Sequence, residues 1–346
     1  MKREIFVGNV GIGGNNPVSV QSMTTTDTRN SEATLEQIRQ LYVAGCEIVR
    51  VAVPDKESVS ALKKIIAESP LPVIADIHFN PDLALGSIDS GVNGIRINPG
   101  NIGSKEKLIR ILNSAAEYNI SIRIGVNAGS IEKKYMRTGR TRAEMMVASA
   151  LDKIRFFEDS GFFNMKLSLK SSNVMETIEA YRKIDKECDY PLHLGITEAG
   201  TLFSGTVKSS IGIGSLLADG IGNTIRVSLT DDPVEEIKVA LEILKVLGLR
   251  ERGLEVVSCP TCARTSVDLI NIVKKFEKEI NTLDLDKNIK IAIMGCEVNG
   301  PGEAKDADIG IAFSKQRAYL FRKGKLIEKL DPENSLDRLI EIIKNI

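Results

Sequence analysis

The sequence has little of several features that would by themselves define a class of protein. It contains no tryptophan, six tyrosines and ten phenylalanines in 346 residues, which is a poor supply of aromatic surfaces for stacking nucleic-acid bases. Lys plus Arg and Asp plus Glu both number 46, so the formal net charge is zero. A general nucleic-acid binder needs an excess of positive charge. We therefore expect no nucleic-acid partner.

Long hydrophobic runs and a disulfide pattern are also missing. No apolar run reaches the roughly 18–20 residues that cross a membrane, and the opening MKREIFVGNVGIGG lacks the apolar core of a signal peptide. Five cysteines are too few, and odd in number, for a disulfide framework. Apolar residues make up 42% and charged residues 27% of the chain, as in ordinary globular proteins. We expect a cytoplasmic protein without a membrane partner.

Residues 1–247 alternate short Val- and Ile-rich segments with helical ones. Eight such units in about 250 residues are typical of a (β/α)8 TIM barrel. A doubly wound open sheet fits less well, because no glycine fingerprint follows the first strand. The glycine-rich segment Gly8–Asn16 precedes that strand and predicts a hairpin at the barrel floor. The expected strands are Val18–Gln21, Ile48–Val51, Val73–Asp76, Gly94–Ile97, Ser121–Val126, Asn164–Ser168, Pro191–Gly195 and Thr224–Ser228.

A second domain is expected over residues 254–346, after the charged linker Gly248–Gly253. Its length suits an independent domain. The fold class is therefore α/β, with a TIM barrel followed by a small α/β domain. The second domain's expected strands are Glu255–Val257, Ile289–Met294, Asp308–Phe313, Ala318–Arg322 and Leu326–Lys329, and its expected helices are Thr265–Glu279 and Pro332–Lys344.

Five barrel strands each carry one cation between apolar neighbours. Such a residue would face solvent in an antiparallel sheet, but parallel barrel strands are covered on both faces. A buried cation needs an anionic partner, and protein carboxylates such as Asp76 and Glu198 are too few for all five. Barrel active sites lie at the carboxyl ends of the strands, and arginine binds phosphate well. An anionic ligand is thus predicted beside Arg50, Arg96, Arg123, Lys166 and Arg226.

The same end of the barrel is expected to carry further polar groups. The only two histidines, His78 and His193, fall in or just beyond barrel strands and are interpreted as substrate contacts. Glu198 follows the seventh strand and is a candidate acid. The basic segment Asn127–Arg142 fits equally well an ordinary solvated loop and a lid over an anion.

Three of the five cysteines gather in the second domain. Cys259 and Cys262 form Cys-Pro-Thr-Cys after a strand, and Cys296 lies on a glycine-rich turn after another strand. This spacing is typical of a metal site. A structural zinc site needs a fourth Cys or His, which this domain lacks. A [4Fe–4S] cluster normally takes four cysteines, so three plus a carboxylate, Glu297 or Glu303, would leave one iron able to bind substrate.

These motifs together resemble a known family, the iron–sulfur 4-hydroxy-3-methylbut-2-en-1-yl diphosphate synthases of the non-mevalonate isoprenoid pathway. The resemblance covers nearly the whole chain, and the combination of motifs is specific. The segments that carry it are Val18–Thr24, Ala75–His78, Arg96–Gly103, Arg123–Asn127, Gly195–Gly200, Cys259–Cys262 and Asn299–Glu303.

The resemblance implies a [4Fe–4S] cluster held by Cys259, Cys262, Cys296 and Glu303. It implies reductive ring opening and dehydration of 2-C-methyl-D-erythritol 2,4-cyclodiphosphate to (E)-4-hydroxy-3-methylbut-2-enyl diphosphate, with two electrons from flavodoxin or ferredoxin. Glu198 and Glu303 would be catalytic, Glu198 as the proton donor. The residues that would hold or surround the substrate are Arg50, Asp76, His78, Arg96, Arg123, Asn127, Lys166, His193, Arg226, Ser228 and Asn299.

A head-to-tail homodimer is also expected. The helix Pro233–Leu247 runs back from the barrel mouth over about 21 Å, so the second domain starts at the floor, and only a short linker follows. Each second domain would then cap the partner's barrel, as the resemblance also implies. Two other functions remain open: a pterin- or phosphate-binding barrel transferase with a structural zinc tail, and a metal-dependent interaction module on a scaffold barrel.

Overall fold

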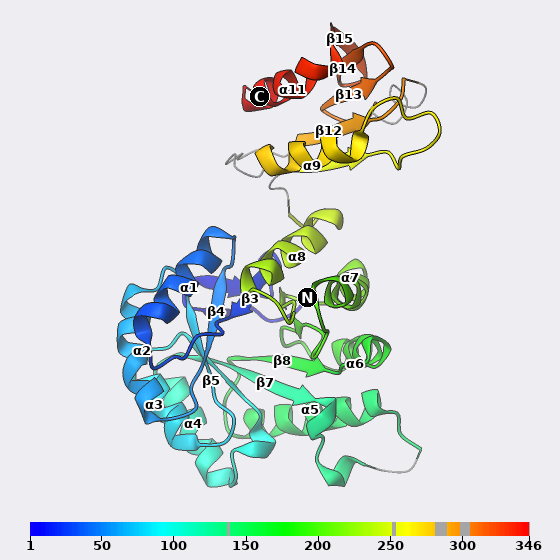
Figure 1. Cartoon of the computed structure of the whole chain (residues 1–346). Coiled ribbons are helices and arrows are strands. Elements are labelled where there is room, and N and C mark those ends of the chain that lie inside the picture. Colours follow the sequence, from blue (N-terminus) through cyan, green and yellow to red (C-terminus); the bar gives the residue numbers. More distant parts are fainter. Residues whose placement is uncertain (137–138, 251–253, 281–288, 298–304, 346) are drawn as a thin grey trace. The chain divides into compact units, whose positions relative to one another are not determined.

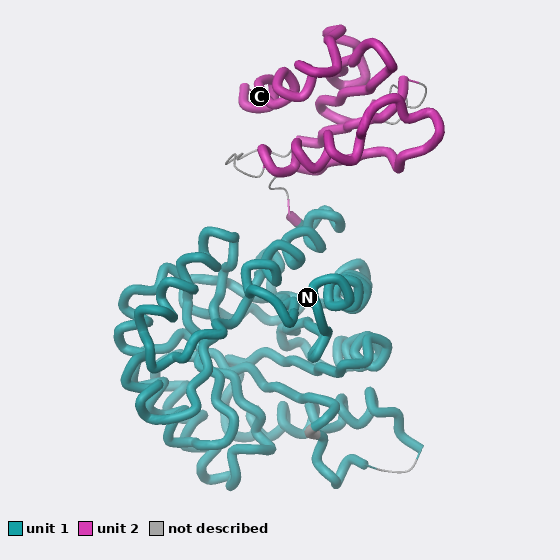
Figure 2. Tube along the Cα trace, in the orientation of Figure 1, with its two compact units in different colours: residues 1–249 teal, residues 250–346 magenta. Residues whose placement is uncertain are grey.

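The computed structural model describes residues 1–136, 139–250, 254–280, 289–297 and 305–345. The chain forms two compact units, Met1–Leu249 and Arg250–Ile346 (Figure 2). We describe each unit by itself. No helix in the described ranges combines the length and the apolar character needed to cross a membrane.

The first unit is built on eight parallel strands, each followed by a helix (Figure 1). The strands pair in the order β8-β7-β6-β5-β4-β3-β10-β9, and a parallel bridge between Leu167 and Leu192 joins the two ends. This arrangement confirms the predicted TIM barrel. The strands are β3 (Ser19–Met23), β4 (Ile48–Ala52), β5 (Val73–Asp76), β6 (Gly94–Ile97), β7 (Ser121–Asn127), β8 (Met165–Lys170), β9 (His193–Leu194) and β10 (Thr224–Ile225).

Side-chain caps start most of the barrel helices soon after the strands end. Asp55 accepts a hydrogen bond from the Ser58 N–H, and Thr141 and Glu144 form a reciprocal capping box. These caps fix the length of the loops at the carboxyl end of the barrel. The helices are α1 (Ser31–Val43), α2 (Lys56–Glu68), α3 (Pro81–Asp89), α4 (Lys105–Glu117), α5 (Arg142–Asp159), α6 (Val174–Glu187), α7 (Leu202–Ala218) and α8 (Pro233–Val246).

An antiparallel hairpin of β1 (Ile5–Val7) and β2 (Val10–Ile12) closes the floor of the barrel. Its buried apolar residues pack against Ile48 and Ile74, which lie near the amino ends of β4 and β5. The floor is therefore filled with apolar side chains, which confirms the hairpin predicted from the glycine-rich segment.

The interior of the barrel is polar, and the main apolar core lies outside it. In β4, Val49 and Val51 belong to the core between strands and helices, whereas Arg50 lies between them in sequence and points to the other side. The same alternation occurs in β6, β7, β8 and β10. TIM barrels usually fill their interior with branched apolar side chains, so this polar interior indicates a binding site.

In its described residues, the second unit is a five-stranded sheet with two helices that share one apolar core with it. The strands β11 (Leu254–Ser258), β12 (Ile289–Met294) and β13 (Ile309–Phe313) are parallel, and β14 (Ala318–Arg322) and β15 (Lys325–Leu330) continue as antiparallel neighbours. The helices are α9 (Leu269–Ile280) and α11 (Ser335–Lys344). The predicted small α/β fold is confirmed.

Several expected boundaries were wrong, among them the end of β10, which lies at Ile225 rather than Ser228. Helix α9 begins at Leu269 rather than Thr265, because Thr265 Oγ1 accepts the Cys262 N–H at 3.0 Å and the Ser266 N–H binds the Gly295 carbonyl at 3.1 Å. Strand β9 is only two residues long. Strand β8 continues two residues beyond the expected end at Ser168, since its ladder with β7 runs on to Lys170.

Candidate active site

Strand register aligns the charged side chains of four neighbouring strands inside the barrel. Asp76 lies beside Arg96, Arg96 beside Arg123, and Arg123 beside Lys166 across β5, β6, β7 and β8. Residues in register in a parallel sheet point to the same side. Their exposed fractions are 4%, 8%, 3% and 1%. A continuous band of buried charged groups therefore lines the inner wall.

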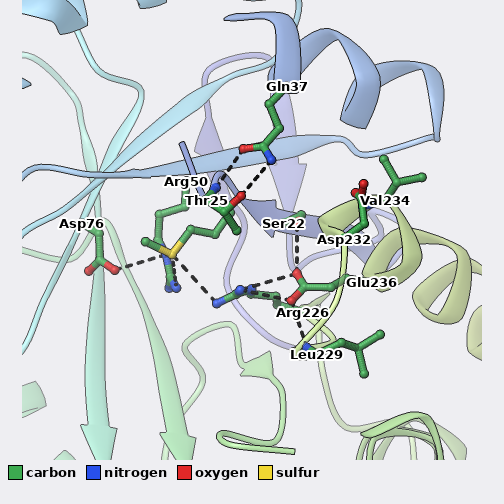
Figure 3. A network of polar contacts seen from close by, with 11 residues as sticks. Ser22, Thr25, Gln37, Arg50, Asp76, Arg226, Leu229, Asp232, Val234 and Glu236 are labelled. Carbon is green, nitrogen blue, oxygen red and sulfur yellow. Dashed lines mark hydrogen bonds and ion pairs between the residues drawn. The ribbon is translucent and has the colours of Figure 1, made fainter. Parts of the chain in front are cut away.

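Asp76 is the carboxylate that holds two of the arginines. Its Oδ1 accepts a hydrogen bond from Arg96 Nη1 at 3.0 Å. Its Oδ2 lies 3.3 Å from Arg50 Nε (Figure 3). Burial alone raises the pKa of Asp76, but the positive charges of Arg50, Arg96 and Arg123 outweigh burial and lower that pKa to about 2. His78 is more exposed, with Nε2 3.8 Å from Asp76 Oδ2. Asp76 is therefore ionised at neutral pH.

Glu236 of α8 holds a third arginine and is a carboxylate that the sequence analysis did not name. Arg226 Nη2 lies 3.3 Å from Glu236 Oε1 (Figure 3). Ser22 Oγ donates to Glu236 Oε2 at 2.9 Å, and the Leu229 N–H donates to Oε1 at 3.0 Å. Sequence analysis missed Glu236 because an acidic residue in the first turn of a helix is common for reasons of the helix dipole.

Met23 lies between two of these guanidinium groups. Its Sδ accepts hydrogen bonds from Arg50 Nε and Nη2 at 3.2 and 3.0 Å, and Arg226 Nη1 lies 4.0 Å away. A thioether is a weak acceptor without charge. Met23 therefore orients Arg50 without neutralising it.

Arg123, Lys166 and Lys170 have no ion-pair partner in the described ranges. Within the same ranges, no hydrogen-bond partner reaches Arg123 Nε and Nη1 or Lys166 Nζ. Burial lowers the pKa of all three groups well below the usual range, and repulsion from neighbouring cations lowers it further. Buried cations without partners are unfavourable, so this part of the interior is built for an anion.

Lys170 is a site residue that sequence analysis missed. The alternation of Lys166, Ser168 and Lys170 along β8 points all three inward, and each is buried. A Cβ on Gly195 would lie only 2.4 Å from Lys170 Nζ, so glycine at that position makes room for the ammonium group. The period-two pattern beyond Ser168 was the signal that could have revealed Lys170.

The other expected barrel residues lie deeper or nearer the rim. His193 in β9 is fully buried, and burial holds its pKa well below the usual value, so the imidazole is neutral. Asn127 ends β7 and Ser228 follows β10. Glu198 is exposed after β9, with a left-handed φ of +53° and no ion pair to a described residue. The structure thus does not join Glu198 to the buried band.

The cysteines of the second unit lie near the carboxyl ends of two parallel strands. Ser258 of β11 lies beside Ile293 of β12. Cys259 and Cys296 follow just beyond these strands, so they lie at the same end of the sheet. The Gly295 N–H donates to Cys259 Sγ at 3.2 Å. Cys262 follows in the next turn. The metal site that the spacing predicts stays a prediction.

The donor set fits a metal that prefers sulfur. All three thiols are free, and hydrogen bonding by the Arg264 backbone, with help from Thr265, lowers the pKa of Cys262. Thiolates suit iron–sulfur clusters and zinc. Glu303 and Asn299, which complete the expected set, lie outside the described residues, and no three potential ligands converge within the described ranges.

The two cysteines of the barrel have different surroundings. Cys46 is buried, and burial raises its pKa to about 12. Cys188 caps α6 and also has a raised pKa, because it is partly buried. Both fit a role as small packing residues.

The fold and these two sites define a barrel protein with a binding site for an anion and a separate thiolate-rich domain. The family model described as the GcpE TIM-barrel domain matches residues 2–241, and the GcpE protein C-terminal domain matches residues 255–345. Proteins named 4-hydroxy-3-methylbut-2-en-1-yl diphosphate synthase (flavodoxin) are close in sequence. The one from Lawsonia intracellularis is 54% identical over 96% of this chain and 93% of its own length. The one from Clostridium acetobutylicum is 54% identical over 99% and 98%.

The chain belongs to the GcpE family of 4-hydroxy-3-methylbut-2-en-1-yl diphosphate synthases, as the resemblance in its motifs indicated. Solved structures add only the fold. Dihydropteroate synthase from Xanthomonas albilineans, in complex with 7,8-dihydropteroate, has a TM-score of 0.52 at 12% identity, covering 71% of this chain and 97% of its own. A truncated 3-deoxy-D-arabino-heptulosonate 7-phosphate synthase from Thermotoga maritima has a TM-score of 0.51 at 18% identity, covering 71% and 94%.

Replacing Asp76 with Asn should destabilise the barrel in a pH-dependent way. At neutral pH the loss leaves Arg50 and Arg96 unpaired and should lower the free energy of unfolding by about 3–5 kcal/mol. A carboxyl with a lowered folded pKa stabilises the fold above its unfolded pKa of 3.8 and loses that contribution as the pH falls toward about 2. Urea denaturation should show the gap to wild type shrinking below about pH 4. The exposed Asp89→Asn is the control, and a constant gap would contradict the ion-pair assignment.

Replacing Arg123 with Met should have the opposite effect on the protein without substrate. Removing a buried cation without a partner should raise the free energy of unfolding by about 1–3 kcal/mol. Inorganic diphosphate should stabilise the wild type against heat but stabilise Arg123→Met much less. The exposed Arg110→Met serves as the control for both measurements. Lower stability with undiminished protection by diphosphate would remove Arg123 from the anion site.

Proposed function

We propose that this chain converts 2-C-methyl-D-erythritol 2,4-cyclodiphosphate, two electrons and a proton into (E)-4-hydroxy-3-methylbut-2-enyl diphosphate and water. The observation that carries the proposal is the imbalance of charge inside the barrel. Six buried or half-buried cations face only two carboxylates, Asp76 and Glu236, among the described residues. The cations are Arg50, Arg96, Arg123, Lys166, Lys170 and Arg226.

The cyclic diphosphate supplies part of the missing negative charge. It carries one negative charge on each phosphorus, and guanidinium and ammonium groups donate strong hydrogen bonds to phosphate oxygens. Arg50, Arg96 and Arg226 are already oriented by Asp76 and Glu236, so they bind without further ordering. Arg123 and the two lysines of β8 gain the partner that they lack in the described part of the barrel. Asn127 and Ser228 contribute neutral contacts at the rim of the barrel. His78 lies at the rim, and His193 lies deeper in the interior.

Glu198 is proposed as the proton donor to the departing water. It lies on the loop after β9, at the carboxyl end of the barrel, and its left-handed backbone is unusual for a residue other than glycine. Strained backbone of this kind often occurs at functional positions. Its exposure lets Glu198 exchange protons with solvent between turnovers.

The second unit is proposed to hold a [4Fe–4S] cluster through Cys259, Cys262, Cys296 and Glu303, with Asn299 beside it. When bound, such a cluster delivers electrons to the substrate one at a time. The Gly295 N–H bound to Cys259 Sγ helps to stabilise a thiolate there. A hard carboxylate among soft thiolates would bind its iron less tightly than a cysteine would, so Glu303 would be the weakest ligand of the set.

Flavodoxin is the proposed electron donor, because the relatives are named for it; ferredoxin is the other candidate. A reduced carrier and three free ligand cysteines suit the reducing cytoplasm, where we place the reaction. The zinc-tailed transferase is not favoured, because the similarity to dihydropteroate synthase is one of fold alone.

A head-to-tail homodimer is proposed from the direction of α8. This helix of 14 residues starts after the carboxyl end of β10 and runs back along the barrel wall for about 21 Å. The chain therefore leaves the barrel at the floor, whereas the anion site opens at the mouth. In a closed dimer each second domain can serve the partner's barrel.

Anaerobically purified protein should test the reaction directly. It should contain about four iron and four sulfide per chain, and reduced flavodoxin should drive conversion of the cyclic diphosphate, followed by mass spectrometry. Glu303→Ala should fold but lose nearly all turnover, whereas Glu297→Ala should keep its iron. A colourless protein loaded with zinc and stable in air would instead favour the transferase.

The dimer arrangement can be tested with one heterodimer. Arg123→Met inactivates the barrel site and Cys262→Ser inactivates the cluster site. When the two chains are co-expressed with different tags and purified as a mixed dimer, one barrel and one cluster domain remain intact on different chains. Service in trans should give about half of the wild-type activity per dimer. An inactive mixed dimer would show that each chain uses its own cluster.

A further inference from the structure

A groove of about 500 Å³ opens beside Cys296 in the second unit. One wall is the turn between β13 and β14, and the other is the segment that follows Cys262. The groove thus lies at the same end of the sheet as the cysteines. Its charged and aromatic lining residues are Arg264, Glu297, Phe313, Lys315, Arg317 and Tyr319.

This groove carries an excess of positive charge. Arg264, Lys315 and Arg317 are exposed there, against the single carboxylate of Glu297. Arg317 pairs with the exposed Asp331 at 2.9 Å, whereas no carboxylate of the described residues forms an ion pair with Arg264 or Lys315. These charges are available to a partner from outside.

The substrate does not account for these cations. The barrel already holds more positive charge than the two phosphorus atoms of a cyclic diphosphate can neutralise. A second groove, of about 400 Å³, adjoins Cys259 but is lined mainly by apolar side chains, among them Leu269, Ile270 and Val273. Of these two grooves, the one beside Cys296 is the one whose charge attracts a large anionic partner.

We propose that the groove beside Cys296 is the docking surface for the electron-carrying protein, a flavodoxin that presents carboxylates around its flavin. The proposal rests on the proposed function, since it assumes that electrons enter at the cysteines. A carrier seated in the groove lies directly against the wall that carries Cys296. Opposite charge speeds the encounter, and the partly exposed Tyr319 offers apolar contact once water is displaced.

Charge reversal at Lys315 tests the proposal on the full-length holoenzyme. Lys315→Glu should raise the KM for reduced flavodoxin, and its Kd in calorimetric titration, by about five- to tenfold at low salt. Arg264→Glu added to Lys315→Glu should raise both further. The effect should fade at high salt, because ions screen exposed charges over roughly 8 Å. Lys315→Ala, which only removes the charge, should show a smaller change of the same sign.

Two controls separate docking from the chemistry. Lys325→Glu makes the same change beside the turn between β14 and β15, at the end of the sheet opposite to the cysteines. This variant should leave flavodoxin binding unchanged. Reduced methyl viologen, a small cationic donor, should drive Lys315→Glu as fast as wild type, with unchanged KM for the cyclic diphosphate and unchanged iron content.

Two outcomes would overturn the docking proposal, and a third would separate it from the proposed reaction. An unchanged Kd for flavodoxin in Lys315→Glu would exclude the groove as its docking surface. A raised KM for the cyclic diphosphate with both electron donors would assign the groove to the substrate instead. If wild type bound flavodoxin in the groove but did not convert the cyclic diphosphate, the proposed reaction would fail while the docking surface stood.

Discussion

The barrel interior depends on one constraint: positive charge that the protein itself only partly neutralises. Asp76 and Glu236 fix Arg50, Arg96 and Arg226 in place, while Arg123 and the lysines of β8 stay without a carboxylate in the described structure. Helices and the floor hairpin exclude water from these groups, so their electrostatic cost is high. A diphosphate that pairs with these cations can lower this electrostatic free energy on binding. The site therefore favours a dianion.

The polar interior also explains how the barrel remains stable. Its apolar core lies between strands and helices, where valine, leucine and isoleucine alternate with the inward charged residues. Folding energy therefore comes from the outer layer, and the inner layer is free to serve binding. The apolar floor formed by β1 and β2 confines the polar site to the carboxyl half of the barrel.

The cysteine motif and the buried cations belong to different units of the chain. Parallel pairing of β11 and β12 brings Cys259 and Cys296 to one end of the sheet, and the groove with Lys315 lies at the same end. One fold thus offers an entry for electrons beside the residues proposed to hold the cluster. The barrel contributes charge, and the second unit contributes thiolates.

The sequence alone determined the barrel, the small second domain, the inward cations and the cysteine motif, because these depend on local periodicity and spacing. It did not reveal that Glu236 holds Arg226, since helix α8 and strand β10 meet only through the fold. It missed Lys170 because the strand end depends on pairing with β7. Strand register, and with it which cations have carboxylate partners, is a relation between segments far apart in the chain, so only the tertiary structure could decide it.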